Sequence, residues 1–317
     1  MSQKSPHQNK IIFLGPQPRD FRDVAQVVSE LDFDKKIGLI SAGWQENELD
    51  HSALIHALDR ETVNLELHGR SEIVAEKEEE FVQAWALRQK HLRHLQEFYR
   101  VRLDAIDEGA RTIAVRHVSD ALLEEQREIT VAQLRHLDDD HLRRCRKLRE
   151  EFDEKWRPFE RPALAEHREA IGALIEDCGL LLITGGHVVA LLNRMRLFSI
   201  PEKITELPIV AWSAGAMTLT EKIVLFHDSP PFGKNLAQVL DFGLGFCSGV
   251  VALPDLSRRV NLDQTTGIGR FAKRMAPSRC IGLDPGGLLT FEKGELVDTK
   301  NSALMKHDGS VQWEWKP

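Results

Sequence analysis

The chain has few cysteines, and none is spaced as a metal site or a disulfide framework requires. Its 317 residues contain four cysteines, Cys145, Cys178, Cys247 and Cys280. They lie far apart, without a CxxC pair or a Cys/His ligand spacing, which argues against structural zinc and against disulfides. We interpret them as reduced, mostly buried thiols. Because the sequence also lacks a phosphate-binding loop and a dinucleotide fingerprint, we predict no metal and no cofactor.

Long apolar runs and an excess of positive charge are missing as well. No stretch approaches the ~20 apolar residues that span a bilayer, and the polar start MSQKSPHQNK lacks the apolar segment of a signal peptide. With a formal net charge of -7, the chain has no broad positive field for nucleic acid or anionic membranes. We therefore expect a cytoplasmic protein that binds neither nucleic acid nor membrane, with residues 1–10 as a disordered tail.

What the sequence does contain is an alternation of short apolar runs with amphipathic stretches such as 21–31. The alternation predicts an α/β fold with a doubly wound, mostly parallel sheet. Beyond residue 280, DPGG, EKGE and KHDG turns separate short strands and predict a C-terminal β-meander at one sheet edge. The apolar runs, typical of buried parallel strands, are 11–14, 37–41, 65–67, 180–184 and 209–212.

A long segment without strand signals interrupts this pattern. Between Ser71 and Arg157 the composition shifts to Glu, Arg, Lys, Leu and Gln without an internal proline. We predict a helical hairpin that turns near residues 108–110 and ends before Pro158. Apolar residues recur in it every seven positions, at Trp85, Leu92, Tyr99 and Ile106. A third helix, from about Pro162 to Glu176 with the proline in its first turn, then returns the chain to the sheet.

The expected domain organisation follows from this interruption. Residues 11–70 and 158–317 form the α/β core, and residues 71–157 form the inserted hairpin. The charges of the hairpin indicate a solvated face. The alternative is that its apolar seam makes it an arm for a homodimer or a protein partner.

The strongest local signal is a serine between an apolar strand and a helix. The segment PIVAWSAGAM places Ser213 directly after the strand. Such an elbow strains the backbone of the nucleophile and needs small neighbours, here Ala211, Gly215 and Ala216. The hydroxyl then projects above the sheet beside a helix N-terminus, whose N–H groups, starting at Ala214, can stabilise an oxyanion. A tight turn with no catalytic role is the alternative interpretation.

A second strand ends in two glycines that open a helix. In LLLITGGHVVALLN, Gly185 and Gly186 let backbone amides point into the crevice where α/β folds bind ligands. We therefore expect Gly186 or His187 to contribute an N–H group to an oxyanion hole.

These motifs, in this order and spacing, resemble the aspartyl dipeptidase and cyanophycinase family of serine peptidases, which has the class I glutamine amidotransferase-like fold. The segments concerned are GGHVVALLNRM, AWSAGAMTL, PDLSRRV, GLDPGG and LLTFEKGE, together with an acidic residue, Asp228. The resemblance covers 163–317 well and 11–67 weakly, and the hairpin has no counterpart in small members. It implies a nucleophile, two oxyanion-loop residues and a histidine-orienting acid: Ser213, Gly185, Gly186 and Asp228.

The sequence departs from the family pattern at the catalytic base. The family has a histidine in a QHFxxR-like segment, and the matching stretch here, LPDLSRR, has Asp255 in its place. A serine hydroxyl needs a positioned base, and a carboxylate with the usual pKa of about 4 is a poor one at neutral pH. His187, which replaces an asparagine of the family, and His227, beside Asp228, are the histidines that could take over. A structural role is the alternative for each.

Two arginines follow Asp255 in the sequence. If Arg258 or Arg259 faces the crevice, it can hold a substrate carboxylate in a bidentate pair. A surface or salt-bridge role is the alternative.

Two functional hypotheses result. The first is a serine-type hydrolase that acts on a peptide or another amide through an acyl-enzyme at Ser213, with a non-standard base. The second is a catalytically inactive family member that binds a ligand in the crevice or acts as a scaffold through its helical arm. Ser213, the Gly-Gly loop and Asp228 favour the first, and Asp255 favours the second. A glutamine amidotransferase proper is disfavoured because the elbow carries serine rather than cysteine.

Overall fold

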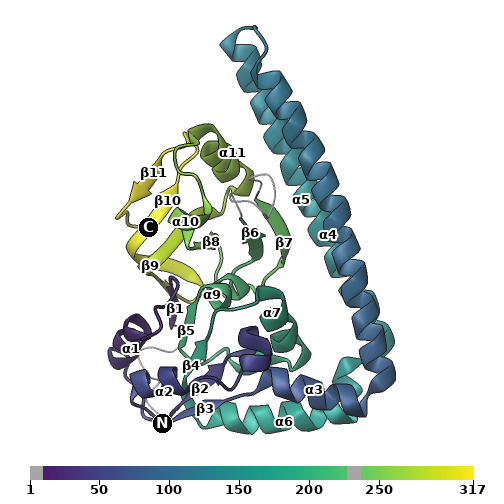
Figure 1. Ribbon diagram of the computed structural model, residues 1–317, viewed down its shortest axis with the longest axis vertical. Helices are drawn as coiled ribbons and strands as arrows, with labels where there is room; N and C mark the ends of the chain where they lie inside the picture. Colours follow the sequence, from purple (N-terminus) through teal and green to yellow (C-terminus); the bar gives the residue numbers. More distant parts are fainter. Residues whose placement is uncertain (1–9, 227–236) are drawn as a thin grey trace.

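The computed structural model describes residues 10–226 and 237–317. The chain forms an α/β core and a long helical hairpin that lies beside the core and projects past it (Figure 1). Of the tail expected at residues 1–10, residues 1–9 lie outside the described part of the chain, and Lys10 is the first residue of strand β1.

A mostly parallel sheet forms the centre of the core. Its order is β11-β10-β9-β1-β5-β4-β2-β3, and β8 also pairs with β9. The run from β1 to β3 is parallel, and β8 pairs in parallel with β9, whereas the pairs β1–β9, β9–β10 and β10–β11 are antiparallel. This confirms a mixed α/β fold with C-terminal antiparallel strands. The strands are β1 Lys10–Leu14, β2 Lys36–Ile40, β3 Thr62–Asn64, β4 Cys178–Ile183, β5 Ile209–Trp212, β8 Val250–Pro254, β9 Arg279–Glu292, β10 Glu295–Met305 and β11 Val311–Trp313.

The central strands are apolar throughout because helices cover both faces of the sheet. On one face, Ile183 and Ala211 pack with residues of α3, α6 and α7. On the other, Leu182 and Val210 pack with residues of α1 and α2. The helices are α1 Arg22–Ser29, α2 Ser52–Leu58, α3 Leu67–Lys77, α6 Pro162–Glu176, α7 Val188–Leu197, α8 Ile200–Lys203 and α9 Ala214–Leu219.

Two parts of the sheet region differ from the sequence prediction. The run 65–67 is not a strand, because Glu66 adopts a left-handed backbone (φ 53) and Leu67 begins α3. Its apolar residues are buried all the same, and a run this short cannot distinguish a strand from the start of a helix. A separate antiparallel pair, β6 (Lys222–Leu225) and β7 (Gln238–Phe242), was not predicted.

The hairpin consists of α4 (Glu79–Ala114) and α5 (Asp120–Trp156). Its turn lies at residues 115–119, so the turn predicted at 108–110 is wrong. Gly109 lies inside α4, because one glycine costs a helix only about 1 kcal/mol. The true start signal is Ser119, whose hydroxyl caps α5 by accepting a hydrogen bond from the N–H of Leu122 (3.4 Å).

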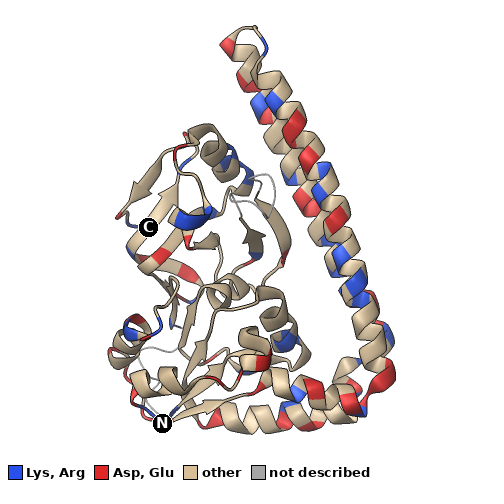
Figure 2. Cartoon of the chain, in the orientation of Figure 1, with Lys and Arg blue, Asp and Glu red and all other residues tan. Residues whose placement is uncertain are grey.

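The seven-residue seam of the hairpin faces inward. Trp85 packs against Phe81 of its own helix and Phe152 of α5. Tyr99 and Ile106 join a cluster that includes residues of β7 and α11. The seam therefore holds the two helices together and against the core. Charged residues of both signs are interspersed along both helices of the hairpin (Figure 2), and among the described helices none is long and apolar enough to cross a bilayer.

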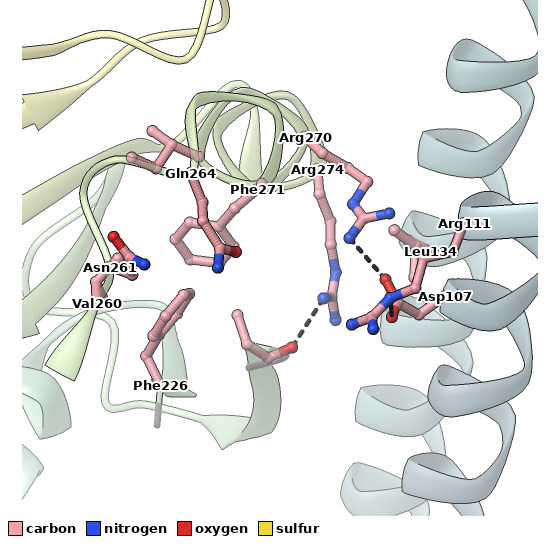
Figure 3. Close-up of a pocket in the computed structure, with 13 residues that line it drawn as sticks. Asp107, Arg111, Leu134, Phe226, Val260, Asn261, Gln264, Arg270, Phe271 and Arg274 are labelled. Carbon is pink, nitrogen blue, oxygen red and sulfur yellow. Dashed lines mark hydrogen bonds and ion pairs between the residues drawn. The ribbon is translucent and has the colours of Figure 1, made fainter. Parts of the chain in front are cut away.

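A buried ion pair fastens the hairpin to the core. Arg274 of α11 (Thr265–Met275) donates hydrogen bonds to both carboxylate oxygens of Asp138 on α5 (2.7 and 2.5 Å) and to the hydroxyl of Tyr99 (2.6 Å). Figure 3 shows Arg274 and Arg270 reaching from α11 toward the arm, where Arg270 pairs with Asp107. The side chains of Arg274 and Asp138 are each only 4% exposed.

A second buried network lies nearer the base of the hairpin. Arg149 of α5 and Arg196 of α7 both pair with Asp241 of β7. Arg88 of α4 stacks on the ring of Trp85 (3.9 Å). Burial, followed by the nearby charge of Arg149, lowers the pKa of Arg88 to about 9. The hairpin is thus attached to the core by charge as well as by apolar packing.

Candidate active site

The carboxyl ends of the parallel strands meet at one edge of the sheet, and several of the expected site residues gather there. Ser213 follows β5, Gly185 and Gly186 follow β4, and Asp255 follows β8. This edge is where α/β folds bind ligands. Two residues that the sequence did not single out, Gly15 after β1 and Gly43 after β2, complete the set.

Ser213 stands in a strained turn between β5 and α9. Its backbone angles are φ 50 and ψ -118, a region that non-glycine residues avoid. The N–H of Ser213 donates to the carbonyl of Leu14 (3.3 Å), and its carbonyl accepts from the N–H of Met217 (3.1 Å). A Cβ at Gly215 would lie 2.5 Å from the carbonyl oxygen of Ile183. The turn therefore depends on a small residue at position 215.

This strain leads to a test that does not depend on activity. We expect Ser213→Gly to be more stable than Ser213→Ala by about 1 kcal/mol, because both variants lose the hydroxyl but only glycine adopts this backbone without strain. The midpoints of urea unfolding, followed by circular dichroism, give the comparison. Equal midpoints would show that the turn stores no strain.

The Gly-Gly loop packs directly on this turn. A Cβ at Gly185 would lie 3.1 Å from Cβ and 3.6 Å from Oγ of Ser213. Gly186 has φ 109, and a Cβ there would lie 2.3 Å from the carbonyl oxygen of Gly43. The N–H of His187 donates to that same oxygen (2.7 Å) and is not free for an oxyanion. Within the described residues, the N–H groups of Gly186 and Ala214 donate no hydrogen bond.

His187 caps helix α7. Its Nδ1 accepts a hydrogen bond from the N–H of Ala190 (3.2 Å). In a neutral imidazole one nitrogen carries the proton and the other accepts, so Nε2 is the protonated nitrogen here. Neither nitrogen is then available to take a proton from Ser213. The other expected members of the catalytic group, His227 and Asp228, lie outside the described residues.

Asp255 lies at the same edge of the sheet as Ser213 because of an unusual strand arrangement. β10 pairs along one edge of β9. The other edge is shared, since β8 pairs in parallel with residues 279–283 and β1 pairs antiparallel with residues 288–292. The carboxyl ends of β8 and β1 therefore face each other across the bend at residues 284–287.

Short contacts at this bend connect the two strand ends. The N–H of Asp255 donates to the carbonyl of Leu283 (2.9 Å). A Cβ at Gly15 would lie 1.9 Å from the carbonyl oxygen of Asp284. Since Leu14 accepts the hydrogen bond from Ser213, the end of β1 and residues 283–284 of β9 connect Ser213 to Asp255.

The two arginines after Asp255 interact with its carboxylate. Nη1 of Arg258 and Nε of Arg259 lie 3.6 and 4.0 Å from Oδ2 of Asp255. The side chain of Arg258 is 83% exposed, and that of Arg259 is half-exposed. The salt-bridge alternative thus has support from the geometry, while both guanidinium groups stay accessible.

Sequence reasoning missed two further residues at this edge. Asp284 accepts hydrogen bonds from the N–H (3.1 Å) and the hydroxyl of Ser257 and so fixes the short helix α10 (Leu256–Arg259) beside Asp255. Gln45, in the loop after β2, has φ 55 and ψ -121, nearly the backbone of Ser213. In the sequence Asp284 belongs only to a DPGG turn, and Gln45 carries no local signal.

The loop that contains Gln45 is anchored at its far end. The buried carboxylate of Glu48 accepts hydrogen bonds from the N–H groups of His68 and Gly69 at the start of α3 (both 2.9 Å). Burial raises the pKa of Glu48. This anchor lies in the same loop as Gly43, which packs against the Gly-Gly loop.

Comparisons with known proteins add little to this geometry. No protein-family model matches the chain, and a search of the curated proteins finds no match. One solved structure, a peptidase from an acI-B1 Actinobacterium, is similar over 96% of this chain and 93% of that chain, with 12% sequence identity and a TM-score of 0.46. A similarity at this level carries no argument about activity, so the function has to be argued from the residues of the site.

Proposed function

We propose that this protein is a serine-type hydrolase that acts on a peptide or another amide, with Ser213 as the nucleophile of an acyl-enzyme. The observation that carries the proposal is the strained backbone of Ser213, held against Gly185 at the edge of the sheet where α/β folds bind ligands. Strained non-glycine residues cluster at functional sites, where the surrounding structure holds them in place. The N–H groups of Gly186 and Ala214 would stabilise the oxyanion of the tetrahedral intermediate.

The base that would activate Ser213 is proposed and is not seen in the geometry described above. In the part of the chain that the structure describes, no basic side chain hydrogen-bonds the Ser213 hydroxyl. We propose His227 as the base and Asp228 as the acid that orients it, because His187 is engaged as a helix cap. Asp255 would then act on the substrate side, where Arg258 and Arg259 would hold a carboxylate of the peptide.

The second candidate function is a catalytically inactive protein that uses the crevice or the arm for binding. Two observations favour it: Asp255 stands where the resembling family has histidine, and the accepting ring nitrogen of His187, Nδ1, is engaged as a helix cap. It differs from the first candidate in one measurable property, the reactivity of Ser213.

Covalent labelling with a fluorophosphonate probe tests the proposal. We expect the purified full chain to be labelled, Ser213→Ala to be unlabelled, and Ser29→Ala to be labelled at the wild-type rate. Ser29 is the control because it is an exposed serine at the end of α1 and takes no part in the candidate site.

Two histidine variants identify the base. His227→Ala should slow labelling by about 100-fold or more, the typical contribution of a general base, whereas His187→Ala should change the rate only a few-fold. If the wild-type chain is not labelled under conditions that mark an active serine hydrolase, the inactive alternative is correct.

A further inference from the structure

The outer face of α4 carries an apolar row that neither α5 nor the core covers. Leu87, Phe98 and Val101 are 54, 62 and 69% exposed. The buried residues of α4, among them Tyr99 and Leu103, lie on nearly the opposite side of the helix. We call this row the outer stripe. It comprises the apolar residues Leu87, Phe98, Val101 and Ala105 together with two histidines on the same face, His91 and His94.

The spacing of the outer stripe distinguishes it from scattered surface residues. Single exposed apolar residues are normal on any protein. The members of the stripe instead alternate at intervals of four and three residues, as the contact positions of a coiled coil do. From Leu87 to Ala105 the stripe is about 27 Å long at 1.5 Å per residue. The stripe is distinct from the inward seam that includes Trp85 and Tyr99.

The charges beside the stripe complement those of an identical helix. Lys90 and Glu97 flank one side of the stripe, and Arg102 flanks the other. If a second α4 lies parallel and in register, Glu97 meets Arg102 of the second copy. If it lies antiparallel about His91 and His94, Lys90 meets Glu97 of the second copy, and Leu87 meets its Phe98. In both orientations oppositely charged side chains pair beside apolar residues that the helix contact buries.

We propose that the protein is a homodimer in which the two α4 helices pack along the outer stripe. The core lies on the far side of α4 from the stripe, so two cores fit around the paired helices. The contact uses no residue of the candidate active site and is independent of the proposed hydrolase function.

Light scattering after size exclusion tests the dimer. We expect about twice the 36.0 kDa of one chain at tens of micromolar, and a return to the single-chain mass for Phe98→Glu/Val101→Glu. The matched control is Leu122→Glu/Ile129→Glu on α5, where the two side chains are 45 and 43% exposed; it should stay dimeric. A single-chain mass for the wild type, or equal behaviour of the two variants, would overturn the proposal.

Cysteine cross-linking tests the same contact without relying on loss of assembly. The four native cysteines are buried, so an introduced surface thiol is the reactive one. In a parallel dimer Val101→Cys cross-links to itself under mild oxidation, and in an antiparallel dimer Leu87→Cys cross-links to Phe98→Cys when the two variants are mixed. Either product supports the stripe contact, and the absence of both contradicts it.

Discussion

Replacing Asp138 by asparagine is expected to destabilise the protein by about 3–5 kcal/mol. The substitution keeps the shape of the side chain but removes its negative charge. In the native protein this carboxylate accepts two hydrogen bonds from the buried guanidinium of Arg274. A buried charge without a partner costs far more than the net contribution of the pair. The free energy of unfolding, from urea titrations followed by circular dichroism, measures the effect. Because the pair joins α5 to α11, proteolysis in the arm should accelerate as well.

A neighbouring carboxylate provides the control for this prediction. Asp140 also pairs with arginines, Arg143 and Arg144, and lies 3.9 Å from Arg102; its own side chain is 15% exposed, but all three arginine side chains are more than half exposed to solvent. Exposed pairs contribute about 0–1 kcal/mol, so Asp140→Asn should have little effect. The double variant Asp138→Leu/Arg274→Met removes both charges and should be more stable than Asp138→Asn. A cost below about 1 kcal/mol for Asp138→Asn would show that the ion pair does not hold the arm.

Replacing Gly186 by alanine is expected to lower the rate of Ser213 labelling by about 100-fold or more, the usual cost of losing one oxyanion donor. The new Cβ would lie 2.3 Å from the carbonyl oxygen of Gly43, and the residue would keep an unfavourable φ of 109. The loop would have to move, and the N–H of Gly186 would move with it. Labelling kinetics with the fluorophosphonate probe give the comparison.

Gly245→Ala is the control for this prediction, because it introduces backbone strain without a steric clash. Gly245 also has a positive φ, of 73, but a Cβ there meets nothing within 4 Å. This variant should lose about 1 kcal/mol of stability and label at the wild-type rate. Wild-type labelling of Gly186→Ala would mean that the loop supplies no oxyanion contact, whatever the nucleophile does.

The sequence predicted most of the elements whose signal is local. The apolar run 209–212 matches β5, and the helix expected from Pro162 to Glu176 matches α6. Strands buried on both faces read as continuous apolar runs, and proline marks a first helical turn, so no distant residue is needed for either assignment. The prediction of the hairpin turn was wrong because the composition around Gly109 is the same whether the helix continues or ends there.

The same distinction between local and long-range signals applies to the candidate site. The elbow and the Gly-Gly loop are single segments, so their position at strand ends could be read from the chain. The approach of Gly15, Asp255 and Asp284 could not, because it depends on two strands sharing one edge of β9. The same holds for Gln45, whose loop packs on the Gly-Gly loop and is anchored to the start of α3.

The shared edge of β9 also bears on the order in which the protein assembles. β1 pairs with residues that follow it by 274 (Leu14 to Leu288) to 282 (Lys10 to Glu292) positions. Contacts this distant in sequence are slow to form, because the intervening chain must first be ordered. During synthesis the elbow strand β5 leaves the ribosome well before the bend of β9. A nascent chain thus carries Ser213 before β9 can join β1 to β8, and the sheet edge where Ser213 and Asp255 lie is complete only when that pairing has formed.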